Sequence, residues 1–300
     1  MPAEVGQPPP GSLRVSPDER LFHPVRPHLA GVGARPGASP AIDRIGPTRR
    51  PRRWPVMRQN WRQLLFLHWA VPAEHVRPLV PPQLDLDLFE DTAWVSLVAF
   101  TITGLRPVGL PPLPGLSSFH ETNVRTYVHR GGRDPGVWFF SLDAANRLAV
   151  LGARLAFHLP YYHARMLLER LPTSRPGDPQ SILYAGVRRR PTPQPAWYTI
   201  RATASGPVRP AEPGTLEHFL VERYLLHAVA GRRLYRGQVH HHPYPLQSAE
   251  VHSFEENLLT AAGIARPDSA PIAHFAGGVD VLVYGLQSGI GPAANLTSPA

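Results

Sequence analysis

The segment FHETNVRTYV, residues 119–128, predicts a β-strand whose two faces differ in character. Successive side chains of a strand point to opposite faces, so one face carries Phe119, Glu121, Asn123, Arg125 and Tyr127. From residue 122 onward, the other face carries only Thr and Val. Whether the polar face meets solvent or lines a pocket decides how the sheet is built. Taken alone, the residues of this segment favour a polar face turned to solvent, with an exposed ion pair between Glu121 and Arg125 that contributes little to stability. The alternative is that the polar face lines a pocket.

The composition narrows the chemistry. A chain of 300 residues with 43% hydrophobic content is enough for one large domain or two small ones. Cysteine is absent, which excludes disulfides, thiolate nucleophiles and cysteine-based zinc sites. Lysine is absent too, so no side-chain amine can form a Schiff base or bind phosphate in a Walker-type loop. Any reaction must therefore use Arg, His, Glu, Asp, Tyr, Ser or a metal.

The chain has a large positive net charge, but its basic residues are not gathered in one segment of the folded part. A net charge of +9 is typical of nucleic-acid-binding proteins. However, the arginines are dense in residues 1–56 and scattered beyond, which does not favour nucleic-acid binding. No apolar run approaches the roughly 18 residues of a membrane helix, and the N-terminus lacks the pattern of a secretory signal. We expect a cytoplasmic protein that binds neither nucleic acid nor membranes.

The chain divides into three parts. Residues 1–56 hold twelve prolines and six glycines, which predicts a disordered Pro/Arg-rich extension. The folded pattern begins abruptly at Met57, which raises the hypothesis that Met57 is the native start. Short strand-like runs with few helices and no βαβ rhythm then predict a single α+β domain, mainly antiparallel, over residues 57–286. A flexible tail is expected over residues 287–300.

The clearest helix is AANRLAVLGARLAF, residues 144–157. Leu148, Leu151 and Leu155 recur at spacings of three and four, which predicts an apolar helix face. Asp143 stands where an N-cap residue is expected.

Two further clusters contain reactive side chains. In HLPYYHARM, residues 158–166, Tyr161 and Tyr162 can donate hydrogen bonds or act as acids, although core packing is favoured. In VHHHPYPL, residues 239–246, only His240 and His242 can share a strand face. No spacing typical of a third ligand accompanies them, so they are weak candidates and no metal site is predicted.

Several ordered segments resemble the YqjF-like family of uncharacterised bacterial proteins, which is regarded as distantly related to acetoacetate decarboxylase. They include WRQLLFLHWAVPAEHVRPLVPPQLDLD, AWVSLVAF, FHETNVRTYV, GVWFFSLDAANRLAVLGARLAFHLPYYHARM, LEHFLVERY, VHHHPYPLQSAEV and AGGVDV. The resemblance runs from about residue 57 to residue 286. It implies an α+β fold built around an antiparallel, cone-like β-barrel with a small-molecule cavity, and it implies no established activity.

The decarboxylase pattern also implies an active site. Arg62 matches an arginine of its first strand, Glu121 matches a glutamate of a central strand, and Arg154 matches an arginine ahead of its lysine pair. Tyr161 and Tyr162 stand in the places of the two lysines. A tyrosine, with a pKa near 10, cannot form an imine, so Schiff-base decarboxylation is excluded.

We therefore predict a small-molecule-binding barrel that needs no cofactor. As an enzyme it would be a lysine-independent lyase or hydratase acting on a small organic acid or carbonyl compound, such as a keto acid. The predicted catalytic residues are Glu121, Tyr161 and Tyr162, and the predicted substrate-binding residues are Arg62, Asn123, Arg125 and Arg154. The alternatives are a non-catalytic ligand-binding or sensing protein and, more weakly, a His-based metal enzyme. A homodimer is expected by analogy with related decarboxylase-fold proteins.

Overall fold

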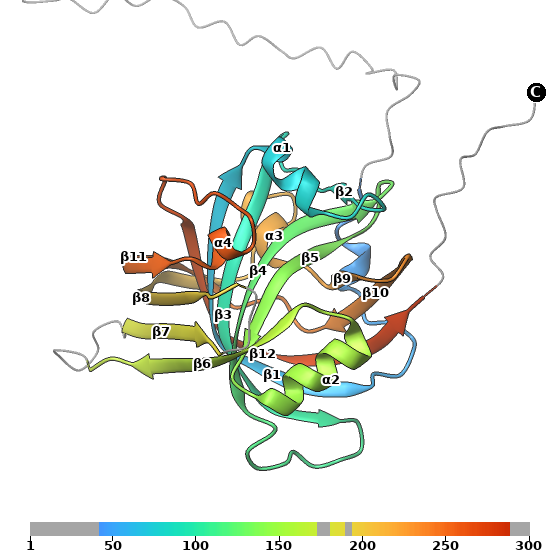
Figure 1. Ribbon diagram of the computed structural model, residues 1–300, viewed down its shortest axis with the longest axis horizontal. Coiled ribbons are helices and arrows are strands. Elements are labelled where there is room, and N and C mark those ends of the chain that lie inside the picture. Colours follow the sequence, from blue (N-terminus) through green and yellow to red (C-terminus); the bar gives the residue numbers. More distant parts are fainter. Residues whose placement is uncertain (1–41, 173–180, 190–193, 289–300) are drawn as a thin grey trace, which may run out of the picture. The chain divides into compact units, whose positions relative to one another are not determined.

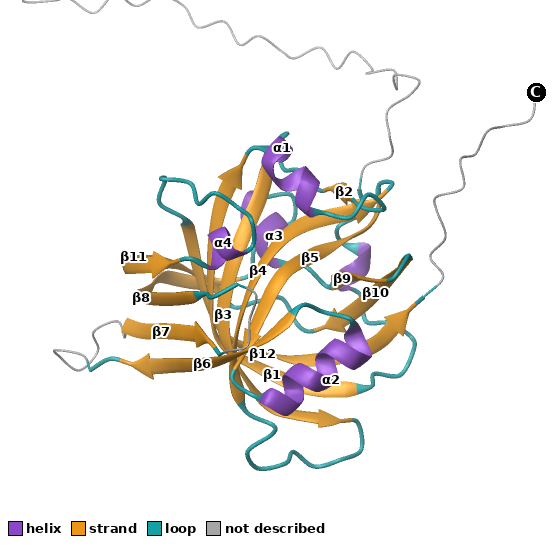
Figure 2. Cartoon of the chain, in the orientation of Figure 1, coloured by secondary structure: helices purple, strands orange, loops and turns teal. Residues whose placement is uncertain are grey.

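The computed structural model describes residues 42–172, 181–189 and 194–288, and strands dominate them (Figure 1, Figure 2). The strands are β1 (Met57–Val71), β2 (Asp85–Leu86), β3 (Ala93–Pro107), β4 (Phe119–Arg130), β5 (Arg133–Ala144), β6 (Tyr161–Arg170), β7 (Ser181–Arg188), β8 (Trp197–Arg209), β9 (Leu225–Ala230), β10 (Arg233–His240), β11 (Leu246–Glu256) and β12 (Ile272–Gln287). The helices are α1 (Ala73–Val76), α2 (Arg147–Phe157), α3 (Leu216–Val221) and α4 (Leu258–Ala261), with 3-10 turns at Gly46–Thr48 and Arg77–Leu79. No helix in the described ranges is both long and apolar enough to cross a membrane.

The strand pairings close into two rings that share five strands. The shared wall has the order β12-β1-β3-β4-β5. One ring returns from β5 to β12 through β9 and β10, and the other returns through β6, β7, β8 and β11. Figure 1 shows β9 and β10 on one side of the wall and β6, β7, β8 and β11 on the other. The predicted α+β class is confirmed, with two parallel pairings, β5–β6 and β5–β9, in an otherwise antiparallel sheet.

Each face of the shared wall packs into its own core. In β1, Leu65 and Leu67 join one core cluster, and Leu64 and Phe66 join the other. The first core lies in the ring of β7 and β8, where it includes Tyr184. Where both faces are buried, wall strands carry continuous hydrophobic runs, such as Leu64–Leu67 in β1, a pattern more usual for buried parallel sheets.

The strand of residues 119–128 follows the same rule. Its Thr and Val face packs in the first core, where Thr122 hydrogen-bonds the Tyr198 hydroxyl at 2.6 Å. Its other face, with Phe119 and Tyr127, belongs to the second core. Residues 119–128 are all buried apart from His120, which is partly exposed, so neither side of the strand is a solvated face.

The ordered structure begins before Met57, earlier than the predicted boundary. Val56 donates its backbone N–H to Val283, and Arg53 donates to the Gly285 carbonyl at 2.7 Å. Arg44 forms an ion pair with the buried Asp87. Residues of the range 42–56 are therefore bonded to the folded domain. Most of the predicted extension, residues 1–41, and most of the predicted tail, residues 289–300, lie outside the described residues.

Helix α2 forms where expected but differs in its cap and its apolar face. Asn146, not Asp143, is the N-cap, and its side chain accepts hydrogen bonds from the backbone N–H groups of Leu148 and Ala149. The three leucines of the predicted apolar face are more than half exposed, and Val150 is the one buried residue of the helix. The leucine spacing therefore predicts the helix, but the leucines are not buried in the core.

Asp143 belongs to β5, where it forms a buried ion pair. The Arg188 Nε lies 2.7 Å from Asp143 Oδ1, and both side chains are almost fully buried. Burial raises the pKa of Asp143 to about 6, although the Arg188 guanidinium opposes this rise. The pair links β5 to β7, two strands that are not neighbours in the sheet.

Replacing Arg188 by Met should destabilise the protein by about 3–5 kcal/mol, because it leaves the Asp143 carboxylate buried without a partner. Urea unfolding followed by circular dichroism measures this change. The control is Arg209→Met, which breaks an exposed pair with Glu217 and should cost less than about 1 kcal/mol. Equal losses of unfolding free energy in the two variants would show that the buried ion pair contributes no more to stability than the exposed one.

Candidate functional site

The ring that contains β9 and β10 encloses a cavity of about 600 Å³. Strands β1, β3, β4, β5, β9, β10 and β12 contribute side chains to its lining. The segment between β3 and β4, residues 108–118, helix α2, the start of β6 and residues of the connecting segments also contribute to the wall. Most lining residues are apolar, and the polar ones include Gln59, Ser117, Glu121, Asn123, Arg125, Tyr161, Arg223, Tyr224 and Tyr244.

The polar face of β4 lines this cavity. Glu121, Asn123 and Arg125 are 4%, 4% and 8% exposed. All three point to the same side because they alternate along the strand. The face therefore lines a pocket, as the match of Glu121 to the decarboxylase's central strand implied, and not solvent, as the segment alone favoured. In the part of the chain described here, Glu121 and Arg125 form no ion pair with each other.

Glu121 is a buried acid with one direct partner. The Tyr161 hydroxyl, at the start of β6, donates to Glu121 Oε2 at 3.0 Å. Burial raises the pKa of Glu121 to about 8, and the Tyr161 hydrogen bond only partly opposes this rise. Burial and the neighbouring Glu121 also raise the pKa of Tyr161 well above its usual value. At neutral pH the pair is therefore mainly a neutral carboxylic acid beside a neutral phenol.

Arg125 is a buried cation without a carboxylate partner among the described residues. Its Nη2 donates to the Leu220 carbonyl at 3.2 Å, and its Nε has no hydrogen-bond acceptor. Burial, then His274 and Arg125, hold the pKa of His68 well below its usual range, and burial lowers that of His241 to about 4. Both imidazoles near Arg125 are therefore neutral. A buried arginine cannot lose its proton, so an anion bound in the cavity would supply the missing charge.

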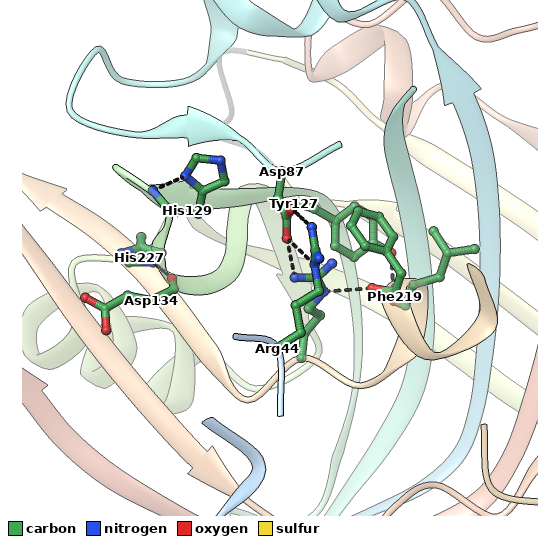
Figure 3. Close-up of polar contacts among 10 residues, drawn as sticks. Arg44, Asp87, Tyr127, His129, Asp134, Phe219 and His227 are labelled. Atoms are coloured by element: carbon green, nitrogen blue, oxygen red, sulfur yellow. Dashed lines mark hydrogen bonds and ion pairs between the residues drawn. The ribbon is translucent and has the colours of Figure 1, made fainter. Parts of the chain in front are cut away.

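Arg223 also borders the cavity, but its charge is neutralised. Its Nη1 lies 2.6 Å from the buried carboxylate of Asp87, which also receives Arg44 (Figure 3). Its Nε donates to the Phe219 carbonyl at 2.7 Å. Of the two cavity arginines, Arg125 is thus the one available to a ligand. The same region contains the Tyr127 hydroxyl, which donates to the Leu220 carbonyl at 2.7 Å.

A residue of the cavity wall also has an amide acceptor without a partner. The Asn123 Oδ1 atom is buried and has no hydrogen-bond partner. Buried side-chain oxygens are nearly always hydrogen-bonded in native proteins, so an orphaned one on a cavity wall indicates a ligand or water contact. Asn123 lies between Glu121 and Arg125, which makes the three residues a continuous polar strip along β4.

Two of the predicted residues lie outside the cavity lining because of strand alternation and helix geometry. Tyr162 follows Tyr161 on β6, and its ring packs on the guanidinium of Arg188. The guanidinium carbon lies 4.1 Å from the centroid of the Tyr162 ring. Arg154 is exposed on α2, and its Nε donates to the Tyr161 carbonyl at 2.7 Å. Of the two tyrosines that stand in the places of the lysine pair, only Tyr161 reaches the cavity.

Arg62 also lies outside the cavity lining, for a different reason. Its side chain is 39% exposed and forms an ion pair with Asp280 at 2.6 Å. The strand has a bulge here, since Gln63 has φ 52 and the pairing register with β3 shifts between Arg62 and Leu65. The bulge exchanges the faces of the strand, so Trp61 before it and Leu64 after it line the cavity.

The histidine cluster does not form a metal site in the described part of the chain. His240 Nδ1 lies 3.1 Å from the Thr48 carbonyl, and His242 is exposed. His241, the residue between them, is buried and stacks on Tyr224 with ring centroids 4.4 Å apart. Within the described ranges, no three His, Asp or Glu side chains are placed to hold a metal together.

Three cavity residues were missed by the sequence reasoning, namely Arg223, Tyr224 and Tyr244. Arg223 and Tyr224 lie in VERYLL, where two polar residues interrupt an apolar run. That interruption of the apolar run was the available signal. Tyr244 follows the three histidines in a segment that pairs with no other strand, so alternation gave no information about its direction.

The chain is similar to known proteins in sequence and in fold. The uncharacterized protein YqjF of Bacillus subtilis (strain 168) is 42% identical over 232 residues, which are 77% of this chain and 92% of YqjF. Among solved structures, the enduracididine biosynthesis enzyme MppR complexed with pyruvate matches with a TM-score of 0.53 and 12% identity, over 79% of this chain and 91% of MppR. An acetoacetate decarboxylase-like enzyme from Sphingomonas wittichii RW1 matches with a TM-score of 0.51 and 12% identity, over 78% and 92% of the two chains.

These structural matches establish a shared fold, as the resemblance implied. The sequence matches establish more, because the family model of DUF2071, an uncharacterized conserved protein, matches residues 58–280. With that match and a relative 42% identical over most of both chains, the chain belongs to the DUF2071 family.

Proposed function

We propose that the protein is a lysine-independent enzyme that transfers protons on a keto acid or related carbonyl compound bound in the cavity, as a lyase or hydratase does. The observation that carries this proposal is the buried Glu121–Tyr161 pair on the cavity wall. A carboxyl group with a pKa of about 8 can donate a proton at neutral pH and take it back within one reaction cycle.

The polar strip assigns a role to each neighbour. Arg125 binds the ligand carboxylate, since its charge has no other partner among the described residues. Asn123 accepts a hydrogen bond from the ligand or from a bound water through its free Oδ1. Glu121 exchanges a proton with the carbon or oxygen that reacts, and Tyr161 donates to the oxygen that gains negative charge. None of these steps needs an amine.

The neighbouring structures support the ligand class. MppR, which shares the fold, is described in complex with pyruvate, a keto acid. The lack of lysine throughout the chain separates the proposed chemistry from Schiff-base decarboxylation.

Replacing Glu121 by Gln should stabilise the protein by a few kcal/mol at about pH 8 and by little at about pH 4.5. Its folded pKa lies above its ordinary value, so the folded state binds the extra proton between about pH 4.5 and about pH 8. Wild-type stability therefore falls as pH rises through this range, whereas Gln is neutral throughout. Urea unfolding at several pH values measures the difference.

The control is Glu255→Gln on the exposed surface of β11, which should change stability little at any pH. A Glu121→Gln gain that is the same at every pH would contradict a buried, protonated acid.

Replacing Tyr161 by Phe should slow proton transfer about 10²-fold, because it removes the donor beside Glu121. The measurement is exchange of the protons next to the carbonyl in D₂O, followed by NMR over a panel of 2- and 3-keto acids. Tyr162→Phe is the matched control and should exchange at the wild-type rate, since Tyr162 packs on Arg188.

The same panel separates catalysis from binding. Keto acids that stabilise both wild type and Glu121→Gln, with no exchange or turnover in either, would replace the enzyme proposal with a non-catalytic binding protein.

A further inference from the structure

We infer that the ligand is an elongated acid with an apolar body, such as a medium-chain or arylalkyl keto acid, and not an acid of three or four carbons. This inference rests on the proposed function, because it specifies the substrate class of the same cavity. Four observations on the cavity support it, namely its volume, the pattern of its walls, the length of its polar strip and the character of its mouth.

The volume is large for a short acid. The cavity measures about 600 Å³, within the roughly 300–1,000 Å³ of sites that hold drug-sized ligands. That volume equals about twenty water molecules at roughly 30 Å³ each. A pyruvate-sized ligand would leave most of the apolar wall in contact with water, which costs free energy in proportion to the apolar area.

The cavity wall has a polar strip on β4 and, beside it, an apolar strip on the neighbouring strand β3. On β3, Val98 pairs with Asn123, and Phe100 pairs with Glu121. Farther out, Ile102 pairs with Phe119. These β3 side chains line the cavity beside the polar strip, and Leu64 and Phe66 of β1 extend the apolar surface. A ligand that lies along β4 therefore meets polar groups on one edge and hydrocarbon on the other.

The polar strip is also long. Glu121 and Arg125 are four residues apart on one strand, so their Cα atoms are roughly 13 Å apart. Glu121 does not neutralise Arg125 at that separation, and a ligand that reaches both groups must be extended. Arg125 lies deeper along the strand, since Glu121 is two residues from Phe119, where the segment 108–118 ends.

The mouth of the cavity is apolar. Leu110 and Leu113 of the segment 108–118 and Leu148 of α2 all line the cavity, and each is more than half exposed. Asn146 holds the two parts together, since its Nδ2 donates to the carbonyls of Gly115 and Leu116 at 3.2 Å. Exposed apolar groups clustered at one opening are typical of a site that receives an apolar ligand.

Helix α2 leaves room for this ligand. The residues it contributes to the cavity include Ala149, Gly152, Ala153 and Ala156. Gly152 is exposed where it borders the cavity, and a Cβ atom added there would meet nothing within 4 Å, so the first atom of a larger side chain fits without a clash. Glycine is a poor residue for a helix interior, and its replacement should also favour the helix. Gly152 is therefore the position at which the cavity can be filled with the least damage to the fold.

The test is titration calorimetry with the straight-chain acids butanoate, octanoate and dodecanoate. With wild type, we expect one ligand per chain and an affinity that rises about fourfold for each added methylene until the cavity is full. Arg125→Gln should weaken octanoate and dodecanoate by similar factors, because both place the carboxylate at Arg125. An affinity that does not depend on chain length would overturn the inference.

Variants of α2 locate the apolar body. Gly152→Leu should weaken dodecanoate at least tenfold and leave the affinity for short acids almost unchanged, with Gly152→Ala as the matched control near wild type. Ala156→Leu provides a second filled cavity if Gly152→Leu folds poorly. Unchanged dodecanoate affinity in both folded Leu variants would place the ligand elsewhere and overturn the inference.

Deuterium exchange separates this inference from the proposed function. Tight binding of long acids without exchange in long-chain keto acids supports the ligand class and overturns the catalytic proposal. Exchange in pyruvate-like acids, together with no affinity for long acids, supports catalysis and overturns the ligand class.

Discussion

The structure depends on one constraint, namely that five strands form a wall buried on both faces. Because this wall closes two rings, the buried central parts of its strands have no solvent side on which to place polar residues. Most of them satisfy this requirement with continuous hydrophobic runs, such as Leu64–Leu67 in β1. Strand β4 is the exception, because three polar side chains alternate on one of its faces. Polar groups packed against an apolar layer would lose their hydrogen bonds, so the fold leaves a cavity in front of them.

The buried charges show which groups are structural and which are free. Asp87 is paired with Arg223 and Arg44, and Asp143 is paired with Arg188, so these carboxylates have cationic partners. Glu121 has no cationic partner among the described residues, and burial makes it a neutral acid. Arg125 cannot respond in the same way, because a guanidinium keeps its proton. The cavity therefore combines a neutral acid with an unpaired cation, which is electrostatically suited to a ligand with one negative charge.

The sequence predicts some of this site well and some of it poorly, for physical reasons. Alternation within residues 119–128 was sufficient to place Glu121, Asn123 and Arg125 on one face. It could not show what that face meets, because this depends on a ring closed by strands far away in sequence. Alternation along β6 also turns the side chains of Tyr161 and Tyr162 to opposite faces. The match of both residues to the lysine pair did not take this into account.

Other differences arise from local geometry that composition does not reveal. The bulge at Gln63 exchanges the faces of β1, so a position matched by sequence order turns Arg62 away from the cavity. The α2 leucines follow a helical period, yet the period does not say which face meets protein and which meets solvent. In Asp143 and Asn146, two residues able to cap a helix stand three apart, and Asp143 is instead used in a buried ion pair.

The rigidity of the wall contrasts with the weak packing of the part that covers the cavity. The reactive side chains Glu121 and Arg125 lie on a central strand of the wall, so their positions are fixed by the two cores. Helix α2 buries only Val150, and its N-terminus depends on Asn146 for both its cap and its link to the segment 108–118. An element with so few apolar contacts has a low local stability. A ligand with an apolar body would add apolar contacts to α2, and its binding would therefore stabilise the helix together with the folded protein.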